Sequence, residues 1–121
     1  MAGIEANREG VLVAVVDGAV RGFVDIRWGD AETKAFVNES EADLKAIYVE
    51  PEYWGEGIGT KLLERGLALL PDLTEAVRLD VFAKNERARQ FYESHGFEQT
   101  DRSEHEIAEQ SFPVAIYSLH S

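Results

Sequence analysis

The chain has 121 residues, of which 45% are hydrophobic, and its formal net charge is −11. This length suits one domain with one core, residues 1–121, and the hydrophobic content excludes a disordered chain. The excess of acids speaks against nucleic acid as a partner, because phosphates are bound by clustered Lys and Arg. Cysteine is absent, so disulfides, thiolate metal sites and cysteine-linked acyl intermediates are excluded.

The sequence carries no membrane or export signal that we recognise. No apolar run is long enough to cross a bilayer, and residues 1–5 lack the basic start and apolar core of a signal peptide. We therefore expect a cytoplasmic protein with no membrane partner. The dispersed acids and scarce lysines suit a high-salt cytosol, where counterions screen self-repulsion. A halophilic source is one interpretation of this surface, and an ordinary acidic bacterial enzyme is the other.

Two strands joined by a tight turn are predicted in the N-terminal part. Residues 11–16 are continuously apolar and residues 22–28 are strand-like. Asp17-Gly18 between them is a hairpin turn signal. Residues 29–41 are polar and irregular, which predicts an exposed loop.

A strand and a helix are predicted next. Residues 43–49 are typical of a strand, which Pro51 ends. An amphipathic helix is predicted over residues 57–70, and Pro71 ends it. The residues expected on its buried face are Ile58, Leu62, Gly66 and Leu69.

A further strand over residues 77–82 precedes a second helix. Leu79 and Val81 alternate with polar residues in that strand. In the helix, Asn85 is a good N-cap and Gly96 stands where a left-handed residue commonly ends a helix. The helical stripe gathers Ala88, Phe91, Tyr92 and His95.

The C-terminal part is predicted to hold two strands. The first starts at residues 97–100, residues 101–112 form a polar, acidic loop, and the last strand covers residues 114–119. This succession predicts an α/β fold, a single domain with a mixed, mostly antiparallel twisted sheet flanked by helices.

Three glycines, Gly55, Gly57 and Gly59, separate the third strand from the first helix. A helix N-terminus presents unpaired N–H groups and a partial positive charge, so it suits an anion such as phosphate. Two familiar phosphate motifs do not fit. A P-loop needs Gly-Lys-Ser/Thr, whereas Thr60 precedes Lys61, and the dinucleotide fingerprint needs a glycine at position 60. A tight turn that binds nothing is the alternative.

These glycines are followed by Asn-x-x-Ala-x-x-Phe-Tyr-x-x-x-Gly-Phe over residues 85–97. The combination resembles the GNAT superfamily of acetyl-CoA-dependent N-acetyltransferases, from about Val11 to the C-terminus. The resemblance implies a GNAT-like fold, acetyl-CoA as cosubstrate and acetyl transfer to a primary amine. Because no cysteine can carry the acetyl group, we expect direct attack in a ternary complex.

The resemblance also implies which residues meet the cofactor. In the family the phosphate loop reads Gln/Arg-x-x-Gly-x-Gly/Ala, so Trp54 replaces the usual Gln or Arg. That departure affects only a side chain, whereas backbone amides serve the pyrophosphate regardless of side chain. The implied loop contacts are Trp54, Gly55, Glu56, Gly57, Ile58, Gly59 and Thr60.

The family's pantetheine arm runs beside the strand that precedes this loop. By resemblance, Ile47, Tyr48 and Val49 contact the cofactor through their main chain, and an amide there serves the oxyanion. An interior strand without this role is the alternative. Asn85 either caps its helix alone or caps it and also bonds the cofactor.

Acetyl transfer also needs an acid and a base. Tyr92 matches the family's frequent general acid, since a phenol of pKa about 10 can protonate a thiolate whose thiol pKa is near 8.5. A core aromatic is the alternative. Asp43 occupies the strand position where some members carry a catalytic glutamate, with Glu41 and a water chain as rivals. No metal is expected, because the histidines lack metal-ligand spacing: His95, His105 and His120.

Only ten residues precede Val11, whereas the family usually has a strand and one or two helices there, which line the acceptor pocket. We therefore expect an N-terminally shortened domain with an open acceptor groove, or one completed by a second subunit; exposed sheet edges favour a homodimer.

The acceptor is expected to be a small-molecule or peptide amine. An acidic surface favours cationic amines, polyamines or lysine-rich peptides through steering. A non-catalytic acetyl-CoA-binding or regulatory module is the alternative function, and a plain structural domain is a third.

Overall fold

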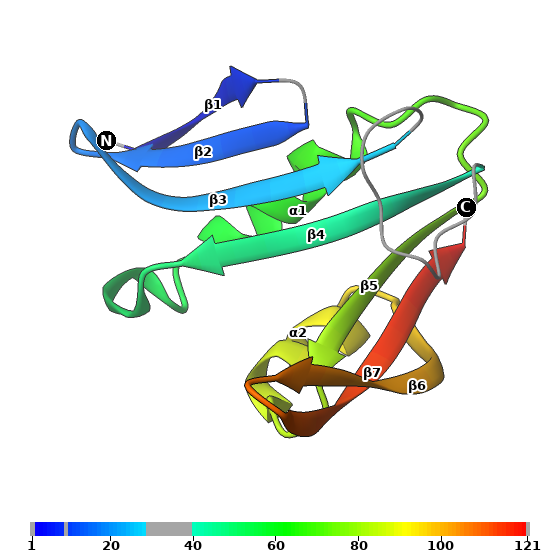
Figure 1. The fold of residues 1–121 in the computed structure, drawn as a ribbon. Helices are drawn as coiled ribbons and strands as arrows, with labels where there is room; N and C mark the ends of the chain where they lie inside the picture. The colour runs from blue at the N-terminus through cyan, green and yellow to red at the C-terminus, as the bar shows by residue number, and fades with distance from the viewer. Residues whose placement is uncertain (1, 9, 29–39, 121) are drawn as a thin grey trace. The chain divides into compact units, whose positions relative to one another are not determined.

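The computed structural model describes residues 2–8, 10–28 and 40–120 (Figure 1). The chain divides into two compact units, Met1–Thr74 and Glu75–Ser121. Each unit has its own strands and its own α-helix. No helix in the described part of the chain is both long and apolar enough to cross a membrane.

The first unit is built from antiparallel strands and one α-helix. Its elements are β1 (Ala2–Arg8), β2 (Val11–Val16), β3 (Ala19–Arg27), β4 (Glu41–Val49), the short 3-10 helix η1 (Pro51–Tyr53) and α1 (Ile58–Leu67). From β1 to β4, each strand pairs with the next along the chain. Helix α1 packs against β2, β3 and β4.

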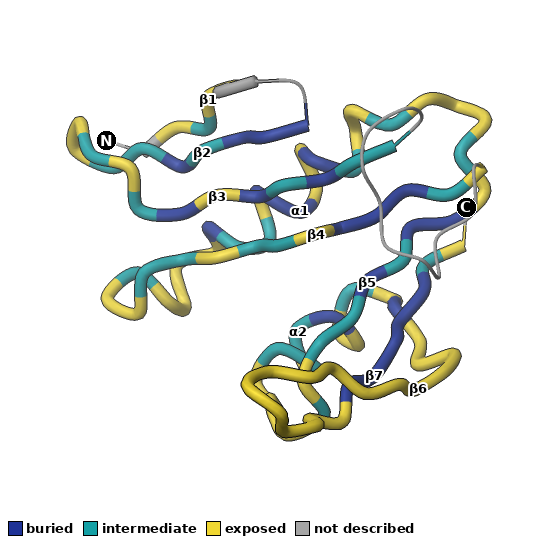
Figure 2. The backbone as a smooth tube through the Cα atoms, viewed as in Figure 1, coloured by how far each residue is buried: buried dark blue, intermediate teal, exposed yellow. Residues whose placement is uncertain are grey.

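The core of the first unit lies between α1 and the strands (Figure 2). Val24 and Ile26 alternate with more exposed residues along β3, and both are buried. They face α1, because a Cβ added at Gly66 would lie 3.5 Å from the Val24 side chain. Leu62 and Leu63 are buried from the helix side. The buried residues recur at every second position in the strand and at every third or fourth position in the helix, and the two sets pack against each other.

The turn predicted at Asp17-Gly18 is confirmed. Val16 pairs with Ala19, so the turn has two residues. Their φ angles are 51° and 83°, as the type I′ turn of a hairpin requires.

The second unit consists of β5 (Ala76–Phe82), α2 (Glu86–Ser94), β6 (Glu98–Ile107) and β7 (Gln110–His120). Strand β7 pairs antiparallel with β5 on one side and with β6 on the other. Helix α2 covers one face of these strands through Tyr117 of β7. Nε of Arg89 donates to the Tyr117 hydroxyl at 3.0 Å, and that hydroxyl donates to Oε2 of Glu93 at 2.6 Å.

Both predicted ends of the second helix are confirmed. The side-chain oxygen of Asn85 accepts from the backbone N–H of Ala88 at 3.2 Å. Gly96 has a φ of 91°, and the N–H of Phe97 donates to the carbonyl of Tyr92 at 3.0 Å. This is the hydrogen bond by which a left-handed glycine closes a helix.

Two strands were not predicted at their full extent. The sequence predicts no strand over β1: its apolar residues Ala2, Ile4 and Ala6 alternate with Gly3, Glu5 and Asn7, but alanine, glycine and asparagine are all poor strand formers. Strand β6 continues to Ile107 and β7 begins at Gln110, so the loop predicted over residues 101–112 is wrong. All ten residues of β6 are exposed (Figure 2), and a strand without a buried face lacks the pattern that would reveal it.

The first helix is shorter than predicted. It ends at Leu67, and Leu69 is 41% exposed rather than part of the buried face. The N–H of Leu70 donates to the carbonyl of Leu67, so the chain tightens ahead of Pro71, which disfavours helical torsions in the residue before it. Of the polar loop predicted over residues 29–41, residues 29–39 lie outside the described residues, and Glu41 already belongs to β4.

Candidate functional site

The N-terminus of α1 is open to a ligand. Gly57 is its N-cap residue, and no side chain caps the helix there. The first helical hydrogen bond runs from the N–H of Lys61 to the carbonyl of Gly57 at 3.1 Å. The N–H groups ahead of this bond lie at the end of the helix that carries its partial positive charge. No acidic residue lies in the first turn to oppose an anion.

The glycines before the helix shape this opening. Gly55 and Gly57 have φ angles of 84° and 82°, torsions that residues with a Cβ rarely adopt. A Cβ at either position would meet no heavy atom within 4 Å. The space beside the loop backbone is therefore empty, and only the torsions demand glycine. Gly59 differs from them, because it is an ordinary residue of the first turn of α1.

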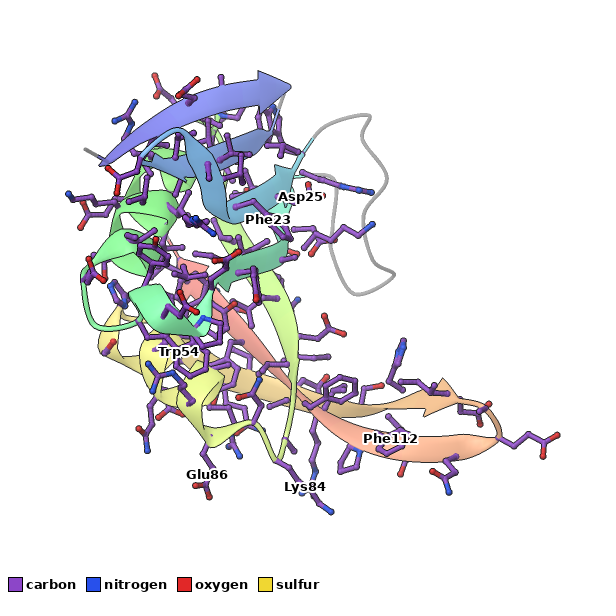
Figure 3. All side chains as sticks on the ribbon, turned by 90° about the vertical axis from the view of Figure 1, so that its left-hand side faces the viewer. Phe23, Asp25, Trp54, Lys84, Glu86 and Phe112 are labelled. Carbon is purple, nitrogen blue, oxygen red and sulfur yellow. The ribbon has the colours of Figure 1, made fainter. Side chains whose placement is uncertain are left out.

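Trp54 fastens the start of the loop to the end of β4 (Figure 3). Its indole N–H donates to the carbonyl of Val49 at 2.7 Å, while its side chain remains 47% exposed. The N–H of Tyr53 donates to the carbonyl of Glu50 at 2.9 Å and closes η1. The indole N–H is therefore engaged within the protein. The Gln or Arg that the family usually carries at this position would instead offer a polar side chain to the phosphate.

Arg21 braces the same turn, and no motif in the sequence pointed to it. Its carbonyl accepts from the N–H of Glu50 at 2.9 Å, and its Nη1 donates to Oε2 of Glu50 at 3.1 Å. Its guanidinium carbon lies 5.5 Å from the centre of the Tyr53 ring, within the range of a cation–π contact. Only the pairing of β3 with β4 brings Arg21 to the loop, so sequence spacing could not reveal it.

The strand predicted to hold the pantetheine arm leads directly into this loop. Ile47 and Val49 pair with Val24 and Gly22 of β3, on the face that α1 covers. Tyr48 pairs with Phe23 on the opposite face, with ring centres 6.2 Å apart. Tyr48 is 49% exposed, so this aromatic pair is accessible to a ligand.

The candidate bases also lie on β4. Asp43 is 1% exposed and pairs in register with Arg27, whose Nη2 lies 3.3 Å from Oδ2 of Asp25. Glu41 is the first residue of the strand and is half-buried. A carboxylate as enclosed as Asp43 can reach an amine only through a bridging water or after a local rearrangement.

Tyr92 and Asn85 belong to the second unit. Tyr92 is 8% exposed, and the rings of Phe91 and Phe97 meet it edge-on at centroid distances of 5.5 and 5.7 Å. Burial, and after it the charge of Asp80, raises the pKa of Tyr92 to about 12. The phenol therefore keeps its proton throughout the neutral range.

The predicted site residues thus fall into two groups. The glycine loop, Ile47–Val49 of β4 and Asp43 lie within the first unit, whereas Asn85 and Tyr92 lie on or beside α2 in the second. Among the described residues, no group of three or more His, Cys, Asp or Glu is placed to hold a metal ion.

Residues 2–97 match the model of the acetyltransferase (GNAT) family. The chain belongs to this family. An uncharacterized N-acetyltransferase of Archaeoglobus fulgidus is 36% identical over 94 residues, which cover 75% of this chain and 61% of that protein. The peptidyl-lysine N-acetyltransferase YjaB of Salmonella typhimurium is 35% identical over 71 residues, 59% of this chain and 46% of that protein. The chain thus spans less than two thirds of the length of these relatives.

Solved structures share the GNAT fold with this chain. The GNAT-family acetyltransferase of Streptococcus pneumoniae superposes with a TM-score of 0.74 at 23% identity, covering 97% of this chain and 71% of that one. Arabidopsis thaliana Naa50, in complex with a bisubstrate analogue, gives a TM-score of 0.76 at 24% identity, with coverage of 93% and 74%. The predicted α/β, GNAT-like fold class is confirmed.

Proposed function

We propose that residues 1–121 act as one N-acetyltransferase domain, which moves an acetyl group from acetyl-CoA to a primary amine. The observation that carries this proposal is the uncapped N-terminus of α1 behind two left-handed glycines with empty space beside them. Membership of the GNAT family and the activities named for the relatives support it.

In this proposal the backbone amides of the loop from Gly55 to Thr60 bind the pyrophosphate of acetyl-CoA. The pantetheine arm lies along Ile47–Val49 and bonds their main chain. Trp54 contributes by holding the loop closed on Val49, rather than by donating to phosphate. Asn85 has its side-chain oxygen engaged as a cap, which leaves its amide group for the cofactor.

The transfer itself is a direct attack. The neutral amine nitrogen attacks the thioester carbonyl carbon, a C–N bond forms, the C–S bond breaks, and the thiolate takes up a proton. Asp43, Glu41 or a water chain from them removes the proton from the amine. Tyr92 supplies a proton to the thiolate. Because its pKa of about 12 exceeds that of a thiol near 8.5, this transfer must accompany C–S cleavage.

The phosphate loop is tested by Gly57→Glu, which places a carboxylate in the empty space beside the α1 N-terminus. Gly18→Glu is the matched control, since Gly18 has a φ of 83° and a Cβ there also meets no atom within 4 Å. Both changes add one negative charge and one strained torsion, so similar losses of melting temperature are expected. Calorimetry should show that only Gly57→Glu abolishes acetyl-CoA binding. Equal affinity in the two variants would refute the loop assignment.

A non-catalytic acetyl-CoA-binding or regulatory module is the second candidate. The enclosure of Asp43, at 1% exposed, favours it because an amine cannot reach this carboxylate directly. Thiol release from acetyl-CoA across a panel of primary amines separates the two functions. A transferase releases thiol in proportion to acceptor, whereas a binding module takes up acetyl-CoA with no amine-dependent release.

We also propose a cytoplasmic, high-salt setting and a homodimeric assembly for the protein. Its acidity is consistent with a cytoplasm of high salt content. A homodimer is proposed because edge strands favour pairing, and light scattering at several protein concentrations tests it.

A further inference from the structure

Arg21 occupies a β-bulge in strand β3. The residues on either side of it pair with consecutive residues of β2, which leaves Arg21 as an extra residue: the pairs are Ala14 with Gly22 and Val15 with Val20. A bulge interrupts the alternation of a strand and re-aims a side chain, and bulges are over-represented next to functional sites. The contacts of Arg21 show where its side chain is directed.

The side chain of Arg21 joins β3 to the segment that follows β4. Its Nη1 donates to Oε2 of Glu50 at 3.1 Å, and its guanidinium carbon lies 5.5 Å from the centre of the Tyr53 ring. Its carbonyl accepts from the N–H of Glu50 at 2.9 Å. We call these three contacts the brace. Because the N–H of Tyr53 donates to the carbonyl of Glu50, the brace holds both ends of the turn that forms η1.

The glycine loop has few other anchors at its start. Residues 54–57 link η1 to α1, and every one of them is exposed. Gly55 and Gly57 have more accessible backbone conformations than other residues, so ordering this loop costs conformational entropy. A ligand that must order a loop binds more weakly than one that meets a loop already in place. The bond of Trp54 to Val49 and the brace both fix the segment from which the loop departs.

We propose that Arg21 is a positioning residue for acetyl-CoA. The brace holds η1, and through it the glycine loop, in the form that binds the pyrophosphate before the cofactor arrives. Arg21 acts in this way without touching the cofactor. The inference rests on the proposed function, because it requires the loop to be the pyrophosphate site. The competing explanation is electrostatic: the positive charge of Arg21 offsets that of Glu50 near an anionic ligand.

The test compares Arg21→Gln with Arg65→Gln. Both variants remove one positive charge from the first unit, and Arg65 is exposed in the last turn of α1, at the opposite end of the helix from the loop. Glu50→Gln and the double variant Arg21→Gln/Glu50→Gln complete a double-mutant cycle. Calorimetry measures acetyl-CoA affinity, and circular dichroism melts establish that each variant folds. Hydrogen exchange over residues 50–57 reports the order of the loop without cofactor.

Arg21→Gln should weaken acetyl-CoA binding by about fivefold and raise its KM by the same factor, with kcat and the KM for the amine unchanged. Residues 50–57 should exchange faster in this variant, whereas its melting temperature should match that of Arg65→Gln, because a half-exposed ion pair contributes little to global stability. Arg65→Gln should bind acetyl-CoA like the wild type.

The cycle separates positioning from charge. If the brace positions the loop, Glu50→Gln should weaken binding by about twofold, although it removes a negative charge near the pyrophosphate. The double variant should bind no more weakly than Arg21→Gln, because the brace is already broken. Arg21→Lys, which keeps the charge and a donor for Glu50, should fall between the wild type and Arg21→Gln.

Three outcomes overturn this inference. Equal acetyl-CoA affinity in Arg21→Gln and Arg65→Gln, or unchanged exchange over residues 50–57, removes the positioning role and leaves the proposed function standing. Tighter binding by Glu50→Gln, or wild-type affinity in the double variant, assigns the effect to charge instead. A wild type that binds no acetyl-CoA refutes the proposed function and the role of Arg21 with it.

Discussion

Tyr92 combines a packing role with a proposed chemical one. Its ring lies among Phe91 and Phe97 with little exposure, while family resemblance assigns its hydroxyl to the leaving thiolate. The two roles make different demands on the same side chain, because packing needs the ring and proton transfer needs only the hydroxyl.

Tyr92→Phe separates these roles. General acids typically contribute ~10²–10⁴-fold in rate, and a phenol of pKa about 12 should lie at the lower end, since it holds its proton tightly. We expect kcat to fall by about 100-fold with acetyl-CoA affinity and melting temperature nearly unchanged. Unchanged turnover in this variant would leave Tyr92 with packing alone.

The same residue should govern stability at high pH. Its folded pKa of about 12 lies above the ordinary value of 10.0, so the folded state opposes ionisation. The stability that depends on the neutral phenol is complete below pH 10 and is lost as the pH rises through about 12. Between pH 10 and pH 12 the wild type should lose about 2 kcal/mol more than Tyr92→Phe. Urea unfolding at pH 8, 10 and 12 measures the difference, and parallel curves for the two proteins would contradict it.

Other residues show where sequence patterns succeed and where they fail. Asn85 and Gly96 are local signals, since a cap depends on neighbours within one turn, and both were predicted correctly. Arg21 braces the loop through contacts with residues 29 and more positions away. No spacing rule reaches across that interval without knowledge of strand pairing.

At the scale of elements, the two hairpin turns differ in how well their residues suit them. Asp17-Gly18 follows the preference of a type I′ turn. The turn between β6 and β7 consists of Ala108 and Glu109, with φ angles of 51° and 70°, and Ile107 pairs with Gln110 around it. Left-handed torsions cost residues such as these roughly 1–2 kcal/mol each.

Replacing Ala108-Glu109 by Asn-Gly should therefore stabilise the protein. We expect a gain of about 1 kcal/mol, visible as a rise of several degrees in melting temperature. No rise in the Asn-Gly variant would mean that the hairpin of β6 and β7 melts separately from the rest of the fold.

Elements with a buried face could be predicted from sequence, and elements without one could not. The sequence predicts a strand over residues 11–16, and β2 covers the same residues, because the strand packs against α1 and its apolar residues reveal it. Strand β6 has no buried residue. Its backbone pairs with that of β7 without burying its side chains, so its sequence shows no alternation of apolar and polar residues. The turn at Ala108 also lacks the Gly, Asn or Asp that usually announces a hairpin.

For the whole molecule, charge is the property that the sequence states most directly. The net charge of −11 is spread over both units, and such a surface repels itself in dilute buffer. The family assignment rests on other features, the loop glycines and the Asn85–Phe97 segment, which are short and local enough to be recognised without the fold. The pairing of the strands and the extent of the hairpin of β6 and β7 can be seen only in the folded chain.

Added salt should stabilise the protein. Counterions shorten the range of the repulsion between carboxylates, so the melting temperature should rise between low and molar potassium chloride. Sodium chloride and choline chloride at equal ionic strength distinguish screening from specific potassium binding. A flat or falling melting temperature would remove the interpretation of a protein adapted to high salt.

The attachment of Trp54 to Val49 also gives the molecule an optical reporter. The chain holds two tryptophans, and Trp54 is a half-exposed indole in the loop assigned to the pyrophosphate. The emission of an indole depends on its hydration and on the hydrogen bond of its ring N–H, so ordering of this loop alters its fluorescence. With Trp28 replaced by Phe, the remaining signal comes from the loop alone, and occupancy of the site can be followed on unlabelled protein in real time.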